Sequence, residues 1–337
     1  MYRAAIIGCG WIGGGGEING DQPYTHAGAY QVHDEVSLVA GCDVNEGRLR
    51  HFGEKWRVVN LYNDFSAFLS HEQVDFLSVC TWDSSHAEIV REVVEARAAK
   101  AIICEKPLAT SSAAAREIVD LCRRHGISLY VNYQRRWDPD HQAVGRWIAE
   151  GACGNIRTIH GYYVRGLFHN GVTWINLLQM LVGNVTRVRA MGAEFSELDG
   201  DPTLSASFEL ENGATATMWG MRRSDYSIFE MDILGSAGRV VLSDNGRDIR
   251  RYQVQDDKDY PGFRRLGLVH RIDAQHSVLA LIQLIREAVL DLKMGRHAFS
   301  TGQDAVRDLE IAELIRQSAA CQGAILPLED ASDVSRK

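Results

Sequence analysis

The chain has 337 residues and a formal net charge of −8, with 45% hydrophobic and 24% charged residues. This acidic balance excludes a typical nucleic-acid binder, whose phosphate contacts need a basic surface, and the composition excludes an intrinsically disordered chain. The length exceeds what one hydrophobic core normally supports, so we expect two domains.

Targeting and redox features indicate a cytoplasmic protein. No run of about 18 consecutive apolar residues is present, so no transmembrane helix and no membrane partner are expected. The N-terminus enters an apolar strand directly and lacks a cleavable signal pattern. Seven cysteines without a Cys-x-x-Cys pair fit reduced thiols, and no cysteine–histidine cluster has the spacing of zinc ligands, so we expect no metal site.

The first part of the chain alternates short apolar runs with helical patterns. Strands are expected at residues 3–8, 36–43, 74–81, 101–106 and 128–133. Helices are expected at residues 85–98 and 111–125. The second of these has serines suited to its N-cap and Gly126 suited to its C-terminus. This alternation predicts an α/β domain with a parallel sheet covered on both faces.

After about residue 155 the pattern changes to one of hairpins. Residues alternate by twos around Asn212-Gly213, and the theme repeats around a turn from Gly235 to Gly238. Two helical stretches follow, at residues 276–294 and 303–320. We therefore expect a second domain built on an open mixed or antiparallel sheet. The predicted domains are residues 1–127 and residues 128–337.

A glycine pattern comes directly after the first expected strand. The sequence "GCGWIG" supplies Gly8, Gly10 and Gly13. In a dinucleotide-binding fold such glycines allow a tight turn, close approach of the backbone to a pyrophosphate, and packing of helix on strand. Asp43 ends the second strand, where an acid binds ribose hydroxyls and repels a 2′-phosphate, which favours NAD over NADP. The alternative is a purely structural glycine turn.

The residues after this pattern depart from the usual motif. Gly14 to Gly16 and then "EINGDQPY" are poor helix formers, and the interval from Gly13 to Asp43 exceeds the usual spacing of about 20 residues. We infer an inserted loop over residues 14–24, with a helix that begins near Thr25. The loop either covers the cofactor or substrate, or is a plain surface excursion.

The stretch "AIICEKPLAT" ends an expected buried strand with Glu105, Lys106 and Pro107. Because side chains alternate along a strand, Glu105 and Lys106 face different environments, and Pro107 excludes Lys106 from the α region and allows a cis peptide. A lysine held at the carboxyl edge of a parallel sheet, beside bound nicotinamide, is suited to take the proton from a substrate hydroxyl. The alternative is a strand that ends in charges because it meets solvent.

The sequence "TWDSSH" follows the strand that ends at Thr81. Ser84 or Ser85 is suited to an N-cap, and His86 begins the next helix. The functional interpretation of His86 rests on its place at the carboxyl edge of the sheet, where cofactors lie. The alternative is a surface or capping histidine.

The motif "GCGWIG", Asp43 and "TWDSSH" are followed along the chain by "CEKPLA", "NYQRRWDP" and "GACGNI". The chain thereby resembles, over nearly its whole length, the glucose–fructose oxidoreductase/inositol dehydrogenase/rhizopine catabolism (Gfo/Idh/MocA) family. The resemblance implies a Rossmann domain, a C-terminal α/β domain and assembly into a homodimer or homotetramer. It also implies NAD(P)-dependent oxidation or reduction of secondary alcohols of sugars, nucleotide sugars or cyclitols.

The resemblance assigns roles to residues by position. Lys106 corresponds to the catalytic lysine. Trp82 and Asp83 depart from the usual proline and asparagine. The cofactor-binding residues that it implies are Gly8, Gly10, Trp11, Ile12, Gly13, Asp43, Thr81, Trp82, Asp83, His86, Glu105, Lys106 and Arg136.

A larger departure lies in "GLFHNGVTWINLLQMLVG". Family members carry an aspartate, a histidine four residues on and an aspartate three further on, where this chain has His169, Thr173 and Asn176. Helical spacing directs His169 and Thr173 to one face. Thr173 can hydrogen-bond a sugar hydroxyl but cannot transfer a proton at neutral pH, whereas His169 can. We expect His169 to be a second catalytic residue; the alternative is a polar residue near a helix start.

We predict an NAD-dependent oxidoreductase that transfers a hydride between the nicotinamide and a secondary alcohol of a sugar, nucleotide sugar or cyclitol. The expected substrate-binding residues are Lys106, Tyr163, Arg165, His169 and Thr173. Two alternatives keep the scaffold. One is an NAD-dependent glycosidase or lyase that oxidises its substrate transiently, and the other is a non-catalytic, ligand-responsive regulatory protein.

Overall fold

The computed structural model describes the chain apart from residues 17–23, 199, 274–276, 299 and 329–337. Two compact units are present. The first comprises Met1–Asp138 and Ser277–Arg307, and the second comprises Pro139–His276 and Asp308–Lys337. This division differs from the expected single boundary between residues 127 and 128. The reason is that a sixth strand after residue 127 and a helix from the C-terminal part both pack within the first unit.

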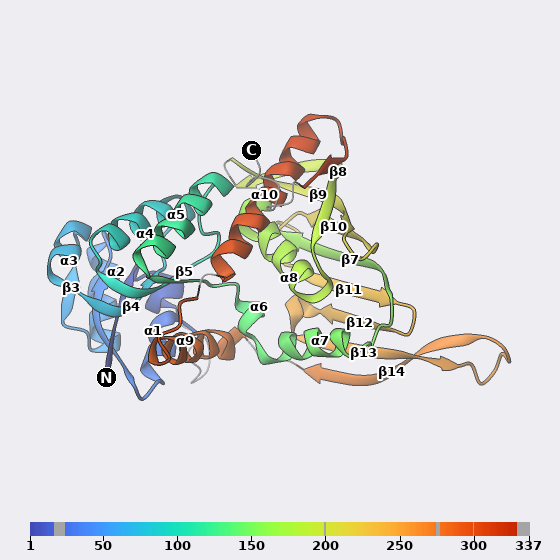
Figure 1. The fold of residues 1–337 in the computed structure, drawn as a ribbon, viewed down its shortest axis with the longest axis horizontal. Coiled ribbons are helices and arrows are strands. Elements are labelled where there is room, and N and C mark those ends of the chain that lie inside the picture. Colours follow the sequence, from blue (N-terminus) through green and yellow to red (C-terminus); the bar gives the residue numbers. More distant parts are fainter. Residues whose placement is uncertain (17–23, 199, 274–276, 299, 329–337) are drawn as a thin grey trace. The chain divides into compact units, whose positions relative to one another are not determined.

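A six-stranded parallel sheet forms the centre of the first unit, in the order β3-β2-β1-β4-β5-β6 (Figure 1). Its strands are β1 (Tyr2–Ile7), β2 (Val36–Cys42), β3 (Asn60–Tyr62), β4 (Val74–Val79), β5 (Ala99–Cys104) and β6 (Ser128–Val131). The predicted strands are confirmed with shifts of one or two residues at their ends. Strand β3 was not predicted, because three residues are too few to establish a period. The strand order reverses between β1 and β4, where nucleotides bind in this architecture.

Seven helices and two short turns accompany this sheet within the described residues. The helices are α1 (His26–Gln31), α2 (Glu46–Trp56), α3 (Phe65–His71), α4 (His86–Glu95), α5 (Ser112–His125), α6 (Gln134–Trp137) and α9 (Ser277–Lys293), and the turns are η1 (Trp11–Gly15) and η2 (Asp83–Ser85). Helix α5 has the predicted ends. The Ser111 hydroxyl accepts a hydrogen bond from the Ala114 amide, and Gly126 adopts a left-handed conformation with φ of +66°.

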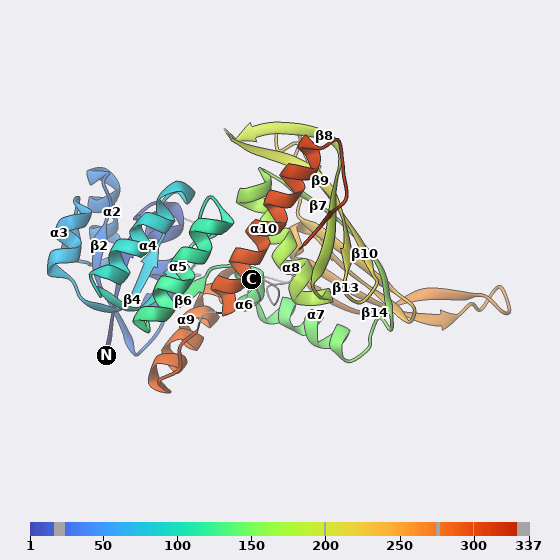
Figure 2. The same cartoon turned by 45° about the horizontal axis from the view of Figure 1, so that its top comes forward.

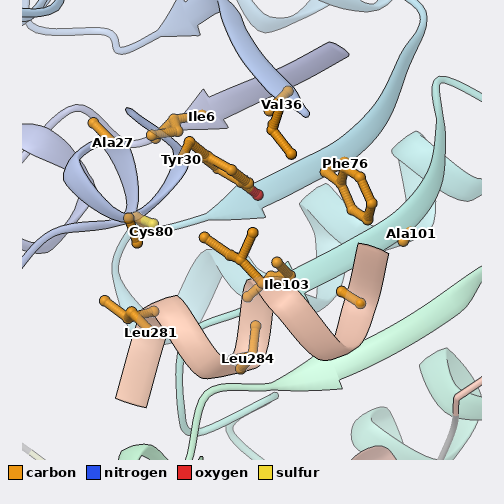
Figure 3. Close-up of a cluster of buried hydrophobic side chains, with 14 of the residues drawn as sticks. Ile6, Ala27, Tyr30, Val36, Phe76, Cys80, Ala101, Ile103, Leu281 and Leu284 are labelled. Carbon is orange, nitrogen blue, oxygen red and sulfur yellow. The ribbon is translucent and has the colours of Figure 1, made fainter. Parts of the chain in front are cut away.

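One face of the sheet packs against α1 and α9. Figure 3 shows Tyr30 of α1 and Leu281 and Leu284 of α9 around Ile103 of β5. The neighbouring residues of β5 on the other face, Ile102 and Cys104, are also fully buried. Both faces are therefore covered, as the near-continuous apolar strands predicted. Alternation along the strand directs Glu105 towards the same face as Ile103.

The second unit contains a nine-stranded mixed sheet in the order β14-β13-β12-β11-β7-β10-β9-β8-β15. Its strands are β7 (Ile156–Val164), β8 (Val185–Leu198), β9 (Asp201–Leu210), β10 (Thr215–Met221), β11 (Glu230–Gly235), β12 (Gly238–Ser243), β13 (Asp248–Asp256), β14 (Arg264–Asp273) and β15 (Leu326–Pro327). Strands β7 and β10 pair in parallel, and the other pairs are antiparallel. The two predicted hairpins, β9–β10 and β11–β12, are confirmed. The β13–β14 hairpin extends beyond the other strands of its sheet (Figure 1, Figure 2).

Helices pack on this second sheet. They are α7 (Pro139–Ala149) and α8 (Val172–Val182), preceded by the turn η3 (Leu167–Gly171), and the last part of α10 (Ser300–Ala320). Trp174 of α8 is fully buried, stacks on Phe208 of β9, and donates from its indole nitrogen to the carbonyl of Glu230. The predicted α/β fold, with a Rossmann sheet and a second mixed sheet, is confirmed. None of the described helices is long and apolar enough to cross a bilayer.

Candidate active site

The three predicted glycines lie in the turn after β1. Gly8 has a φ of +91°, and a Cβ atom built there would lie 2.6 Å from the carbonyl carbon of Cys80. A Cβ atom built on Gly13 would collide with the carbonyl oxygen of Gly8. At Gly10, in contrast, a Cβ atom would meet no heavy atom of the described residues within 4 Å. Two glycines are thus required by the turn itself, whereas Gly10 leaves room for a ligand.

The chain leaves this turn without entering a long helix. Trp11 to Gly15 form the single turn η1, and the Gly14 carbonyl accepts a hydrogen bond of 2.9 Å from the Trp56 indole nitrogen. Helix α1 begins at His26, and the Thr25 hydroxyl accepts from the Gly28 amide, which confirms the predicted start. The middle of the predicted 14–24 loop, residues 17–23, lies outside the described residues.

Trp11 and Ile12 differ in what they offer to a cofactor. The Trp11 side chain is 55% exposed and makes an edge-to-face contact with the Tyr24 ring. The side chain of Ile12 is partly buried and packs against the hydrophobic core that includes Ala27 and Tyr30 of α1. Any contact of Ile12 with a pyrophosphate would therefore be made by its backbone.

Asp43 follows β2 and is buried. Its carboxylate accepts hydrogen bonds of 2.8 Å from the backbone amides of Cys9 and Asn45. The carboxylate thereby orders the glycine turn, a role that sequence reasoning did not predict. Cys9 lies between Gly8 and Gly10, so the acid predicted to bind the ribose is held directly beside the glycine turn. Its ribose-binding role stays a prediction.

The segment after β4 lies between the glycine turn and the end of β5. Trp82 is 74% exposed, and Asp83 opens the turn η2. Ser85 occupies the N-cap position of α4, but its hydroxyl donates to Thr81 and does not cap the helix. His86 is fully buried rather than a surface group, and its ring nitrogens lie 2.7 Å from the Pro107 carbonyl and 3.2 Å from the Thr81 carbonyl. His86 thus links the ends of β4 and β5.

The Glu-Lys-Pro stretch follows β5 directly, and the peptide between Lys106 and Pro107 is cis. One carboxylate oxygen of Glu105 lies 2.9 Å from His26 Nε2 and 2.7 Å from Asn132 Nδ2. Burial opposes the ionisation of this carboxyl group. The hydrogen bond and charge of His26, followed by the hydrogen bond of Asn132 and the charge of Lys106, outweigh that effect, so the pKa of Glu105 is lowered. Glu105 is therefore an ionised carboxylate fixed at the strand end.

Arg136 lies on α6 in the same unit. Its guanidinium forms an ion pair of 3.0 Å with Asp304 of α10. Burial raises the pKa of Asp304, and the Arg136 charge lowers it only in part. The pair fixes the direction of the arginine side chain, and the predicted contact of Arg136 with the cofactor stays a prediction.

In the second unit, His169 lies on η3, the turn that runs directly into α8. The backbone amides of Phe168 and His169 donate hydrogen bonds of 2.8 Å to the two carboxylate oxygens of Asp201. Burial raises the pKa of Asp201 more than these amide bonds lower it. Asp201 thus anchors the turn that presents His169.

Thr173 and Asn176, the two other positions at which the chain departs from the family pattern, are buried. Thr173 is 6% exposed, and its hydroxyl oxygen has no hydrogen-bond partner among the described residues. Asn176 donates to a carboxylate oxygen of Asp308, which is fully buried. Asn176 therefore has a structural role in joining α8 to α10, and Thr173 presents a buried hydroxyl one turn from His169.

The structure does not support the predicted substrate-binding role of Tyr163. It is fully buried in β7, and its hydroxyl donates to the Leu204 carbonyl and accepts from the Leu204 amide. Its neighbour Tyr162 is 38% exposed, because residues alternate between the faces of the strand. We do not propose Tyr163 as a substrate contact. Arg165 is partly exposed, has a φ of +71°, and stays a prediction.

Comparison with known families decides the classification. Residues 2–133 match the model of an oxidoreductase family with an NAD-binding Rossmann fold, GFO_IDH_MocA. Residues 165–241 match the GFO/IDH/MocA C-terminal domain. The chain belongs to the Gfo/Idh/MocA oxidoreductase family.

Individual relatives of this Gfo/Idh/MocA protein are distant. The D-apiose dehydrogenase of Paraburkholderia graminis is 31% identical over 235 residues, which cover 64% of this chain and only 60% of that protein. The myo-inositol 2-dehydrogenase of Thermotoga maritima is 25% identical over 271 residues, covering 73% and 76% of the two chains. A levoglucosan dehydrogenase solved in complex with NADH has a TM-score of 0.80 at 18% identity, covering 98% and 99%, and shares the fold.

Four residues that contact the Gfo/Idh/MocA motifs or their neighbours were not predicted from the sequence. They are His26, Asn132, Asp201 and Asp304. His26 carried a weak signal, because it follows the predicted cap Thr25 at the buried start of a helix. Asn132 carried another, as a polar residue at the end of an apolar strand. Asp201 and Asp304 carried none, since their partners are far away in the sequence.

Proposed function

We propose that this chain is an NAD-dependent dehydrogenase that acts on a secondary alcohol of a sugar or cyclitol, with Lys106 as the main acid–base residue. One observation carries the proposal. Strands β1, β4 and β5 are parallel neighbours, so Gly8, Thr81 and Lys106 follow strand ends at one edge of the sheet. A glycine turn with room for a pyrophosphate and a lysine two strands away suit a dinucleotide and its reacting alcohol.

The residues of this chain have distinct tasks in the proposed reaction. A bound NAD⁺ supplies the hydride acceptor for the alcohol carbon. Lys106 accepts the proton of the alcohol at Nζ when its amine is neutral. Glu105 and the His86–Pro107 hydrogen bond hold the backbone on either side of Lys106. Asp43 binds the adenosine ribose and disfavours a 2′-phosphate, which is why we propose NAD rather than NADP.

His169, Thr173 and Arg165 of the second unit stay predicted substrate contacts: an imidazole can transfer a proton, and a hydroxyl and a guanidinium can hydrogen-bond sugar hydroxyls. The substrate class rests on the named relatives, which include dehydrogenases of D-apiose and myo-inositol. The expected homodimer or homotetramer and the cytoplasmic location stay predictions.

A turnover screen tests the proposal. The purified protein with NAD⁺ is incubated with D-apiose, myo-inositol and a panel of aldoses, cyclitols and glycosides. NADH formation is followed by absorbance, and products are analysed by chromatography. We expect NADH to accumulate with at least one polyol. Conversion of a glycoside without net NADH would instead support transient oxidation. Absence of turnover across the panel, from protein that is folded and binds no NADH, would favour the non-catalytic alternative.

A further inference from the structure

A buried chain of hydrogen bonds crosses the first unit beneath the end of β5. The Tyr30 hydroxyl lies 2.8 Å from Ser78 Oγ, which in turn lies 2.9 Å from His26 Nδ1. His26 Nε2 lies 2.9 Å from the carboxylate of Glu105, and Asn132 donates to the same oxygen at 2.7 Å. Its members come from α1, β4 and the residues that follow β5 and β6. Nothing in the proposed proton transfer uses His26, Ser78 or Tyr30.

The direction of each hydrogen bond follows from the inventory of donors. Burial raises the pKa of Tyr30, so its phenol stays protonated and donates. If Tyr30 donates to Ser78, the Ser78 hydroxyl donates to His26 Nδ1, and the proton on His26 Nε2 is donated to Glu105. Each hydroxyl and each ring nitrogen is satisfied in this arrangement, and the carboxylate is the final acceptor.

His26 is held firmly by its surroundings. It is the first residue of α1, directly after the Thr25 cap, and its exposed fraction is 0%. Ala27 and Tyr30 of the same helix pack into the core shared with α9, as Figure 3 shows. A side chain fixed at both ring nitrogens and carried by a packed helix holds its partner in one place.

We propose that His26 is a positioning residue for Lys106: its Nε2 proton fixes the Glu105 carboxylate and thereby the strand end from which Lys106 projects. The inference rests on the proposed function of Lys106. It also gives α1, the helix that follows the extended glycine segment, a direct link to the reacting lysine.

The groups that face Glu105 define the electrostatic setting of this link. His26 approaches from α1, and Asn132 approaches from the end of β6. Burial raises the pKa of Glu105, whereas the hydrogen bond and charge of His26, the Asn132 hydrogen bond and finally the Lys106 charge lower it. The thiols of Cys80 and Cys104 lie within reach of the Glu105 charge. Burial, followed by that charge, raises their pKa, so they stay neutral.

Two substitutions separate the two hydrogen bonds of His26. The amide nitrogen of a glutamine in His26→Gln lies where Nε2 lies and can donate to Glu105. The amide oxygen of an asparagine in His26→Asn lies where Nδ1 lies and can accept only from Ser78. His51→Gln on the exposed face of α2 is the matched control.

Two readouts keep the inference separate from the proposed function. The first is kcat and KM at saturating NAD⁺ with the best substrate of the screen. The second needs no substrate: lysines are reductively methylated with ¹³C-formaldehyde, and the Lys106 signal, assigned by its loss in Lys106→Arg, is followed by NMR against pH. We expect His26→Asn to lower kcat by about tenfold to a hundredfold with KM little changed. It should also move the Lys106 signal, while His26→Gln and His51→Gln resemble the unaltered protein.

The outcomes are decisive in either direction. If His26→Asn and His26→Gln both keep the original Lys106 signal and kcat, His26 is only a core histidine and the proposal is wrong. If no substrate is found, the Lys106 signal alone decides, because it does not depend on turnover. Should His26→Asn fail to fold, Glu105→Gln removes the carboxylate that His26 is proposed to fix, and an unmoved Lys106 signal there would contradict the proposal.

Discussion

Replacing Lys106 with methionine is expected to lower kcat roughly a thousandfold, within the range that one positioned acid–base group contributes. Methionine keeps an unbranched side chain of similar length but cannot accept a proton. NADH affinity should change little, because the proposed pyrophosphate and ribose contacts are those of Gly10 and Asp43. Steady-state kinetics with the best substrate of the screen, together with an NADH titration of the variant, measure both quantities.

Lys100 supplies the matched control for this experiment. It lies on the same strand, β5, but its side chain is 66% exposed and forms a surface ion pair of 2.8 Å with Asp75. Such a pair contributes little to stability, so Lys100→Met should leave kcat and the thermal midpoint nearly unchanged. Equal loss of kcat in the two variants, or full activity in Lys106→Met, would show that Lys106 is not the acid–base residue.

Alanine at Gly13 is expected to prevent proper formation of the glycine turn and to abolish NADH binding. Its Cβ atom would collide with the Gly8 carbonyl oxygen and would lie 3.3 Å from a methyl group of Ile6. Because one of these neighbours is backbone, relief requires the turn to move. We expect the free energy of unfolding to fall by about 3 kcal/mol or more, at the upper end of overpacking effects. Urea denaturation followed by circular dichroism measures it.

Gly10→Ala isolates ligand binding from folding. Because its Cβ atom would contact none of the described residues, the free energy of unfolding should stay within about 0.5 kcal/mol of the original value. A pyrophosphate that approaches the Gly10 backbone would nevertheless meet the added methyl group, so NADH affinity should fall at least about tenfold. If Gly10→Ala binds NADH normally, the cofactor does not approach this turn as proposed.

The fold could be predicted where local pattern determines it. The apolar runs of the first unit set its strands, and turn residues such as Asn212-Gly213 set the hairpins. The Ser111 and Gly126 caps of α5 were visible for the same reason, because capping depends on neighbouring residues. The return of α9 to the first unit could not be predicted, since its apolar face fits either sheet equally well in sequence. Tertiary packing decides between them.

In the candidate site, too, sequence patterns predicted local motifs but not contacts between distant residues. Spacing located the glycine turn, Asp43 and the Glu-Lys-Pro strand end, because each belongs to a short motif. It could not show that the Asp43 carboxylate binds the Cys9 amide or that Glu105 binds His26, since those partners are 34 and 79 residues away. Tyr163 was misassigned because a one-residue step along a strand exchanges the exposed face for the buried one.

Calorimetric titration of the purified protein with NADH and, separately, with NADPH tests the central claim most directly. The proposed site predicts that NADH binds at least about tenfold more tightly, because the buried Asp43 carboxylate accepts ribose hydroxyls and repels a 2′-phosphate. Tighter binding of NADPH would contradict the role of Asp43. No binding of either dinucleotide, by folded protein free of retained cofactor, would contradict a dinucleotide site at the glycine turn and with it the dehydrogenase proposal.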